Sequence, residues 1–364
     1  MDPEGHQGRP PAGGETAPAL SVVVPAYNEA DRLEQGMARL AAVLDAGIVP
    51  RGTTEVLVVD DGSTDGTDRR AHELLRAFAP SRVVRLPHNG GKGAAVRAGM
   101  AAARGTRVAF MDADMSIDPE QLGSLVAALD HAAVAIGSRA LGGESIDYGN
   151  LTRNLMGRAF NRLVNTVTGV GLADTQCGFK AFAAPAGKLL FHLGVIDGFA
   201  FDVELLHLAQ RLGLEVAEVP VTWQHVADSS VRPLSDPLSM LADLVASRTG
   251  LRSPRPVEAV ELDAAAGRAE RLVELVGPTL PLLEGPDTVT VLFPLCVPTR
   301  VAQLAELVAG AGLGPVRRTA LTVAQLAERA PLGLQVTGAA PVRPPVPAAD
   351  GGAGATGARA EHPQ

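Results

Sequence analysis

Cysteine and long hydrophobic runs are both scarce in this sequence. Only two of its 364 residues are cysteines, Cys177 and Cys296, which is too few for a disulfide framework and gives no metal-ligand spacing. A reducing, cytoplasmic environment is therefore the expectation. No apolar run approaches the ~18 residues that a membrane-spanning helix requires. We expect a protein that touches a membrane at most and does not cross it.

Positive charge is not in excess either. The formal net charge is −8, which argues against nucleic acid as a main partner, because phosphate backbones are bound by basic patches. Residues 1–19 are rich in glycine and proline and have neither a basic flank nor an apolar centre. We expect a disordered tail there and not a signal peptide.

From residue 20 onward, apolar runs alternate with helical periodicities. The predicted strands are 21–24, 55–59, 82–86 and 107–110, and the predicted helices are 31–46, 67–78 and 93–103. Near-continuous Val, Ile and Leu strands between helices predict an α/β fold with a mostly parallel central sheet covered on both faces. Ligands of such sheets bind beyond the carboxyl ends of the strands.

The later part of the chain divides by composition. The stretch EVAEVPVTW predicts an edge strand, and prolines predict a linker over residues 253–263 that separates residues 20–252 from a small α/β module at residues 264–338. The Pro, Ala and Gly-rich residues 339–364 predict a disordered tail. With 46% hydrophobic residues, the chain can bury one large core and a second, smaller one.

Two carboxylates follow a predicted buried strand in the stretch MDADMS. Successive side chains of a strand point to opposite faces, so Asp112 and Asp114 share one face. Like charges there are costly unless a cation or a ligand lies between them. The alternative is a solvated turn with a helix cap, because Ser116 or Asp118 before Pro119 is also a helix start.

A glycine turn precedes a predicted helix in the stretch HNGGKGAAVRAGM. A dinucleotide-binding loop needs glycine or alanine where Val96 stands, and a P-loop needs serine or threonine where Gly93 stands. Neither pattern is satisfied. The remaining interpretations are a helix N-terminus that suits an anion, with Lys92 as a candidate ligand-binding residue, or a helix entry that binds nothing.

The stretch DDGSTDGT follows another predicted strand. It does not satisfy the calcium-loop pattern, and neither does DADMSID. An Asx turn and a helix cap explain Ser63, Asp65 and Thr67. Two adjacent carboxylates at a strand end favour a functional role for at least one of Asp60 and Asp61.

Six stretches occur in a fixed order between residues 21 and 182, namely SVVVPAYNEADRL, VLVVDDGSTDGT, HNGGKGAAVRAGM, MDADMS, AIGSRA and DTQCGFKAF. This constellation resembles family 2 glycosyltransferases of the GT-A fold, and within them the polyprenyl (dolichyl) phosphate glucose and mannose synthases. DTQCGFK and FAFDVELL are more similar to the glucosyl branch. The resemblance covers about residues 20–252 and does not extend to the remainder.

The resemblance implies a donor site at the strand ends. The residues implied to surround the nucleoside and its base are Pro25, Tyr27, Glu29, and Asp60 or Asp61. Asp112 and Asp114 would bind Mg²⁺ or Mn²⁺ against the donor diphosphate, as hard cations are bound by few carboxylates together with phosphates and water. Ser116 stands where mannose synthases often have a further glutamine ligand, which favours the glucosyl branch.

The resemblance also implies an acceptor site. A polyprenyl phosphate is already an anion near neutral pH, so its oxygen needs positioning and charge compensation more than deprotonation. Arg139 and Arg153 match the family's acceptor-phosphate arginines, with a solvated helix face as the alternative for Arg153. Asp174 would lie near the acceptor or cap a loop, and Lys180 would support that loop. Ser230 stands where relatives commonly have a lysine.

Taken together, the resemblance and these residues imply a metal-dependent, inverting hexosyltransferase that uses a nucleotide-diphosphate sugar, with UDP-glucose as the expected donor and a polyprenyl phosphate as acceptor. One alternative is transfer to a hydroxyl of a small molecule, lipid or glycan, which needs a general base such as Asp174 or Asp202. Another is a non-catalytic nucleotide-sugar-binding protein, which the intact acid pair argues against.

A lipid acceptor implies contact with a membrane. The stretch DPLSMLADLVASRTGLRS has apolar residues at helical spacing, followed by arginines: Leu238, Leu241, Leu244 and Val245, then Arg248 and Arg252. It predicts an amphipathic helix that lies at the inner face of the membrane, or one that packs on the catalytic core.

Overall fold

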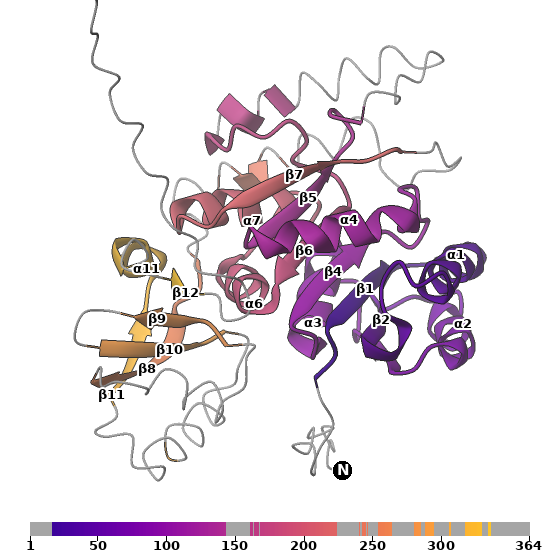
Figure 1. Ribbon diagram of the computed structural model, residues 1–364, viewed down its shortest axis with the longest axis horizontal. Coiled ribbons are helices and arrows are strands. Elements are labelled where there is room, and N and C mark those ends of the chain that lie inside the picture. Colours follow the sequence, from indigo (N-terminus) through magenta and orange to yellow (C-terminus); the bar gives the residue numbers. More distant parts are fainter. Residues whose placement is uncertain are drawn as a thin grey trace, which may run out of the picture.

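The computed structural model describes residues 17–142, 161–162, 164–166, 168–223, 240, 242–244, 246, 254–263, 280–284, 288–294, 306, 317–329 and 334–335. These residues form a seven-stranded sheet in the N-terminal part of the chain and a five-stranded sheet in the C-terminal part (Figure 1). Among them, no helix is both long and apolar enough to span a membrane.

The first four strands of the larger sheet are parallel. They are β1 (Leu20–Ala26), β2 (Thr54–Asp60), β3 (Ser81–Arg85) and β4 (Arg107–Met111), in the order β3-β2-β1-β4. β2 is buried along its whole length, as expected for a strand covered on both faces. All four strands lie where the apolar runs predict them.

One antiparallel strand interrupts this pattern. β6 (Phe179–Ala183) runs antiparallel to both β4 and β5 (Val134–Ser138), and β7 (Val216–Pro220) pairs in parallel with β5 at the edge. The predictions of a mostly parallel sheet and of an edge strand at EVAEVPVTW are therefore confirmed.

Helices cover both faces of this sheet. They are α1 (Leu33–Asp45), α2 (Thr67–Leu74), α3 (Lys92–Ala102), α4 (Leu122–Ala127), α6 (Ala184–Leu193) and α7 (Phe201–Arg211). Short 3₁₀ turns are Arg51–Thr53, Leu75–Ala77, Pro119–Gln121 and Ala128–Asp130. Along β1, Val23 packs into the core with α3, α6 and α7, whereas Val22 and Val24 pack into the core with α1, α2 and α4. The strand's alternation thus builds two cores.

The C-terminal sheet is antiparallel, with the order β11-β8-β10-β9-β12. Its elements are β8 (Val257–Asp263), β9 (Leu282–Glu284), β10 (Thr288–Phe293), β11 (Arg317–Leu321), β12 (Leu334–Gln335) and the helix α11 (Val323–Arg329). β8 contacts α6, and its Val257 and Ala259 belong to the same core as that helix.

The prediction of a linker at residues 253–263 is wrong for residues 257–263. Residues 257–263 form β8, which pairs with two other strands. The prolines that favoured a linker, Pro254 and Pro256, precede the strand, and Val257 and Val260 are fully buried. Burial of this apolar pattern outweighs the local effect of the prolines.

The segment predicted to lie at a membrane surface falls mostly outside the described residues. Two of its described side chains, Met240 and Leu244, are buried in the core beside α7. The prediction that Leu244 faces a bilayer is therefore wrong, and the described part of the segment packs on the protein instead.

A buried ion pair ties β6 to α7. Lys180 is fully buried, and its Nζ lies 2.8 Å from Asp202 Oδ1 and donates a hydrogen bond to the carbonyl of Cys177 at 2.6 Å. Lys180 thus supports the loop before β6, as the sequence predicts. Removing one partner of a buried pair leaves an uncompensated charge.

We expect Lys180→Met to lower the free energy of unfolding by about 3–5 kcal/mol, because Asp202 is then left buried beside an apolar side chain. The double variant Lys180→Met/Asp202→Leu removes both charges and is expected to regain much of this loss. Urea unfolding followed by circular dichroism measures both. A double variant as unstable as the single one would contradict the assignment.

Candidate active site

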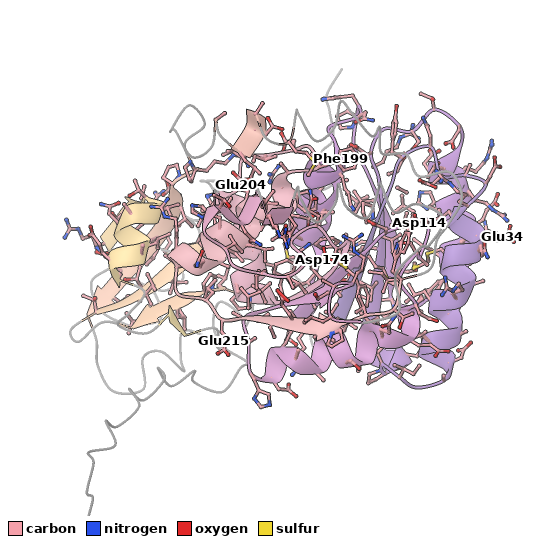
Figure 2. The ribbon with its side chains drawn as sticks, turned by 90° about the horizontal axis from the view of Figure 1, so that it is seen from above. Glu34, Asp114, Asp174, Phe199, Glu204 and Glu215 are labelled. Atoms are coloured by element: carbon pink, nitrogen blue, oxygen red, sulfur yellow. The ribbon has the colours of Figure 1, made fainter. Side chains whose placement is uncertain are left out.

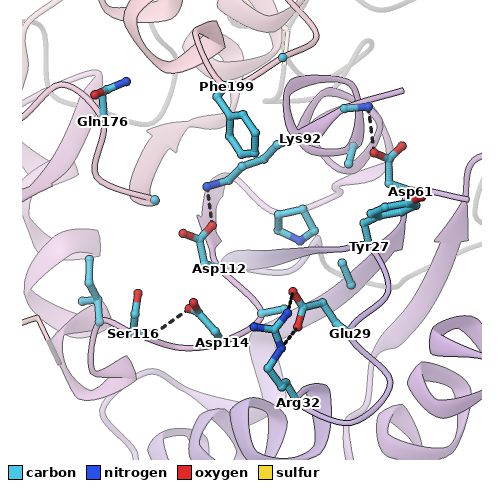
Figure 3. Close-up of a pocket in the computed structure, with 18 of the residues that line it drawn as sticks. Tyr27, Glu29, Arg32, Asp61, Lys92, Asp112, Asp114, Ser116, Gln176 and Phe199 are labelled. Atoms are coloured by element: carbon cyan, nitrogen blue, oxygen red, sulfur yellow. Dashed lines mark hydrogen bonds and ion pairs between the residues drawn. The ribbon is translucent and has the colours of Figure 1, made fainter. Parts of the chain in front are cut away.

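A cavity of about 520 Å³ opens at the carboxyl ends of β1, β2 and β4 (Figure 3). The sequence-predicted residues that line it are Pro25, Tyr27, Glu29, Asp61, Lys92, Asp112, Asp114 and Arg139. Asp60 and Asp174 do not line it, and Arg153 and Ser230 lie outside the described residues. One pocket thus brings together side chains from five separate stretches of the sequence.

The loops after β1 and β2 hold each other in place. The backbone N–H of Asn28 donates to Ser63 Oγ at 2.9 Å, and that of Glu29 donates to Thr67 Oγ1 at 2.9 Å. In return, Asn28 Oδ1 accepts a hydrogen bond from the backbone of Thr64 at 3.0 Å. Ser63 and Thr67 therefore have structural roles, as predicted, but neither caps the helix: Gly66 is the N-cap of α2, and no side chain caps it.

The two adjacent acids after β2 point to different surroundings. Asp60 is fully buried, accepts a hydrogen bond from the backbone of Ser63 at 3.0 Å and lies 3.3 Å from Arg85 Nε. Asp61 lines the cavity, and burial raises its pKa. The sequence leaves open which of the two faces a binding site, and in the structure Asp61 lines the cavity whereas Asp60 does not.

The glycine loop before α3 is capped by the protein itself. Asp61 accepts hydrogen bonds from the backbone N–H groups of Gly90 at 2.8 Å and Gly91 at 2.9 Å. The carbonyl of Asp197 accepts hydrogen bonds from Gly93 at 2.8 Å and Ala94 at 3.3 Å. These four amides are therefore not open to an anion, and this loop presents the Lys92 side chain to the cavity instead.

Gly91 is required by the close approach of two loops. Its φ of +96° is in the left-handed region, and a Cβ there would lie 2.5 Å from the carbonyl oxygen of Asp197. The loop that carries Asp197 is in turn held by Arg97, which donates hydrogen bonds to the carbonyls of Gly194 at 3.3 Å and Ile196 at 3.1 Å. α3 and this loop thus form one supported unit.

Lys92 is paired with the first acid of MDADMS. Its Nζ lies 2.6 Å from Asp112 Oδ1 (Figure 3). Burial opposes the charge of Lys92, but the carboxylates of Asp112 and Asp202 outweigh burial and raise its pKa. Lys92 is therefore charged at neutral pH.

Three carboxylates face this part of the cavity. Asp112 and Asp114 follow β4, and Glu29 reaches in from the loop after β1, where Arg32 Nε lies 2.7 Å from its Oε2. Burial raises the pKa of Glu29 and outweighs the attraction of Arg32, and Asp114 and Asp112 raise it further. The three carboxylates therefore lie close enough for Asp112 and Asp114 to disfavour the charge of Glu29.

The helix cap predicted near MDADMS is Asp118. Its Oδ1 accepts a hydrogen bond from the backbone of Glu120 at 3.1 Å, and Pro119 is the first residue of the turn. Asp114 instead accepts a hydrogen bond from the backbone of Ser116 at 3.0 Å and lines the cavity. The capping alternative thus explains Asp118 but not the acid pair.

The acid pair has the donor chemistry for a hard divalent cation. Carboxylate oxygens suit Mg²⁺ or Mn²⁺, which complete their coordination with phosphates and water. The described residues contain no group of three or more His, Cys, Asp or Glu able to hold a metal by themselves. Asp112 and Asp114 therefore fit a cation that a substrate helps to hold.

Arg139 is fixed by Asp174 on another side of the cavity. Arg139 Nε donates to Asp174 Oδ2 at 2.7 Å, and Nη2 donates to Oδ1 at 2.9 Å. Burial raises the pKa of Asp174, but the hydrogen bonds and charge of Arg139 outweigh it and hold the pKa below its usual value. Asp174 therefore orients an arginine that lines the cavity, and does not line it itself.

Two features of this cavity have no clear signal in the sequence. Gly178 lies so close to the acid pair that a Cβ there would be 2.1 Å from Asp112 Oδ2. Phe199 is 37% exposed, lines the cavity and lies beside Lys92 in Figure 3. In the view of Figure 2, Asp114 and Asp174 lie away from the edge of the molecule, whereas Glu34 lies at its edge. A glycine and an aromatic residue have too many ordinary roles for sequence alone to assign these.

The chain is similar to proteins of one family. The model of "Glycosyl transferase family 2" matches residues 21–185. The Drosophila melanogaster dolichyl-phosphate beta-glucosyltransferase is 39% identical over 238 residues, covering 62% of this chain and 73% of the relative. The human protein of the same name is 37% identical over 238 residues, covering 62% and 74%.

Similarity to solved structures is weaker. A crystal structure of glucosyl-3-phosphoglycerate synthase from Mycobacterium tuberculosis in complex with Mg²⁺ and UDP is 24% identical, with a TM-score of 0.48. The match covers 66% of this chain and 83% of that chain.

The Arg139–Asp174 pair predicts a pH dependence of stability. Because the pKa of Asp174 in the folded protein is below its usual value of about 3.9, folding favours the charged carboxylate. The pair's contribution is complete above about pH 5 and is lost as the pH falls below about 4. We expect Asp174→Asn to lower the free energy of unfolding by about 1.5–3 kcal/mol at pH 7, and by less at pH 3.

Urea unfolding of the parent and the variant from pH 3 to pH 7 measures this difference. Asp130→Asn is the matched control, since the Asp130 carboxylate is half exposed and its ion pair with Arg107 is expected to contribute little. A parent-to-variant difference for Asp174 that grows as the pH falls would show that the pair is not the source.

Proposed function

Since this chain belongs to glycosyltransferase family 2 and is a glycosyltransferase, we propose that it transfers glucose from UDP-glucose to a polyprenyl phosphate with the help of a divalent cation. The observation that carries this proposal is the meeting of an acid pair, Asp112 and Asp114, and a fixed arginine, Arg139, in one cavity. The names of the relatives, dolichyl-phosphate beta-glucosyltransferases, support the sugar and the acceptor class.

The donor nucleoside would occupy the side of the cavity at the ends of β1 and β2. Pro25 and Tyr27 offer an apolar wall there, and Asp61 offers a carboxylate edge. Tyr27 is 44% exposed, which leaves it accessible to a base. This division of roles agrees with a nucleotide that lies across the strand ends of an α/β sheet.

The diphosphate would lie near the acid pair. Asp112 and Asp114 would hold Mg²⁺ or Mn²⁺, which when bound neutralises charge on the leaving diphosphate. Lys92 reaches the same region and adds a positive charge from the protein itself. Phe199, above Lys92 in Figure 3, narrows this side of the cavity.

The acceptor phosphate would be held by Arg139. Asp174 fixes the guanidinium in place, and the raised pKa of Arg139 keeps it charged. An arginine that is oriented before the ligand binds loses less freedom on binding. The acceptor oxygen, already anionic, would attack the anomeric carbon opposite the diphosphate, so that the configuration inverts.

Transfer to a hydroxyl acceptor is less well supported. It requires a general base, but Asp174 is bound to Arg139 and its pKa is lowered. Asp202 is buried beside Lys180 and does not line the cavity. The two acids that the sequence offers as bases are therefore both engaged, whereas a phosphate acceptor needs neither of them.

The direct test offers the purified chain Mg²⁺ or Mn²⁺, a panel of UDP- and GDP-sugars, and either polyprenyl phosphate or water-soluble acceptors, with products identified by mass spectrometry. We expect polyprenyl phosphate glucose from UDP-glucose.

Asp114→Asn is expected to lower turnover by at least ~10²-fold, because it weakens the cation site that stabilises the leaving group. Asp118→Asn, the same change outside the cavity, is the matched control. Transfer to a soluble acceptor alone, or turnover of Asp114→Asn within tenfold of the parent, would contradict the proposal.

A second prediction separates acceptor from donor. Arg139→Ala is expected to raise the KM for polyprenyl phosphate by about 10–100-fold, since a charge-assisted, bidentate contact is lost, and to change the Kd for UDP by less than about twofold. Separate titrations of acceptor and nucleotide measure the two effects, with Arg107→Ala as the control outside the cavity. If Arg139→Ala weakens the binding of the acceptor and of the nucleotide equally, Arg139 would be assigned to the donor instead.

A further inference from the structure

The backbone around Lys92 is held in place by hydrogen bonds. It is the first residue of α3, and the amides on either side of it are held by Asp61 and by the carbonyl of Asp197. The backbone of Lys92 is therefore fixed by contacts that do not involve its side chain. What remains free to move is the aliphatic chain that carries the ammonium group.

The ammonium group lies within a series of alternating charges. Lys180 Nζ is 2.8 Å from Asp202 Oδ1, Asp202 attracts Lys92, and Lys92 Nζ is 2.6 Å from Asp112 Oδ1. Asp112 is thus compensated by Lys92 before any ligand enters.

A divalent cation would compete with Lys92 for the same carboxylate. An ammonium group at hydrogen-bond distance from Asp112 and a cation bound to Asp112 would repel each other strongly in a half-buried pocket. The diphosphate of the donor brings new negative charge to the same region. It offers the released ammonium group a partner that it does not have in the free protein.

We propose that Lys92 is a resident counter-ion of the cation site, which occupies Asp112 in the free protein and moves to the donor diphosphate when the cation binds. This inference rests on the proposed function, because it takes Asp112 as a ligand of the cation. It makes cation and diphosphate mutually dependent, since each helps to displace Lys92 from Asp112. Such coupling is reciprocal by thermodynamic necessity.

A competing explanation predicts the opposite change in cation affinity when Lys92 is removed. If Lys92 only holds the Asp112 side chain in the correct orientation for a cation, its removal weakens cation binding. If Lys92 competes for Asp112, its removal strengthens cation binding in the absence of nucleotide. A binding measurement therefore separates the two without any measurement of turnover.

The probe is Mn²⁺, measured as free Mn²⁺ by electron paramagnetic resonance with the full chain, with and without UDP. Lys92→Met removes the charge and keeps the side-chain length, whereas Lys92→Arg keeps the charge. Without UDP, we expect Lys92→Met to bind Mn²⁺ about tenfold more tightly than the parent and Lys92→Arg to stay within about twofold of it. UDP should tighten Mn²⁺ binding less in Lys92→Met than in the parent.

A failure of this inference can be distinguished from a failure of the proposed function. Circular dichroism confirms folding, and Arg76→Gln, an exposed charge outside the cavity, controls for net charge. If the parent binds Mn²⁺ with UDP but Lys92→Met binds Mn²⁺ no more tightly without UDP, the counter-ion role is overturned while the cation site stands. If the parent binds no Mn²⁺ even with UDP, the cation site and this inference fall together.

Discussion

The compensation of buried charge at the carboxyl edge of the larger sheet is the constraint on which the site depends. Lys180 and Asp202 form a buried pair, and Lys92 pairs with Asp112 in the cavity. On another side, Asp174 compensates Arg139. Because isolated buried charges are so costly, these partners determine where each charged group can stand when a substrate arrives.

The loops that carry these charges are rigid because they bond to one another. The loops after β1 and β2 exchange hydrogen bonds through Asn28 and Ser63, and Asp61 links the loop after β2 to the glycine loop. The carbonyl of Asp197 accepts hydrogen bonds from Gly93 and Ala94 in the first turn of α3. A site built in this way is oriented before its ligands bind, which reduces the entropy lost on binding.

Much of the fold could be predicted from the sequence. The apolar runs of β1, β2 and β4 and the helical patterns of α1 and α3 predict their own structure, because burial demands such residues locally. β8 could not be predicted in the same way, since Pro254 and Pro256 dominate its local signal and its pairing partners lie far along the chain. The family match confirms the resemblance that the ordered motifs carry.

The sequence by itself determined the fold class, the family and the stretches that carry the chemistry, because these depend on local periodicity and on the order of motifs. Only the tertiary structure decided that Asp61 and not Asp60 faces the cavity, that Asp174 orients Arg139, and that Leu244 is buried. It also brought Lys92 to Asp112. These outcomes depend on the direction of each side chain and on contacts between residues distant in the chain, which neither composition nor spacing encodes.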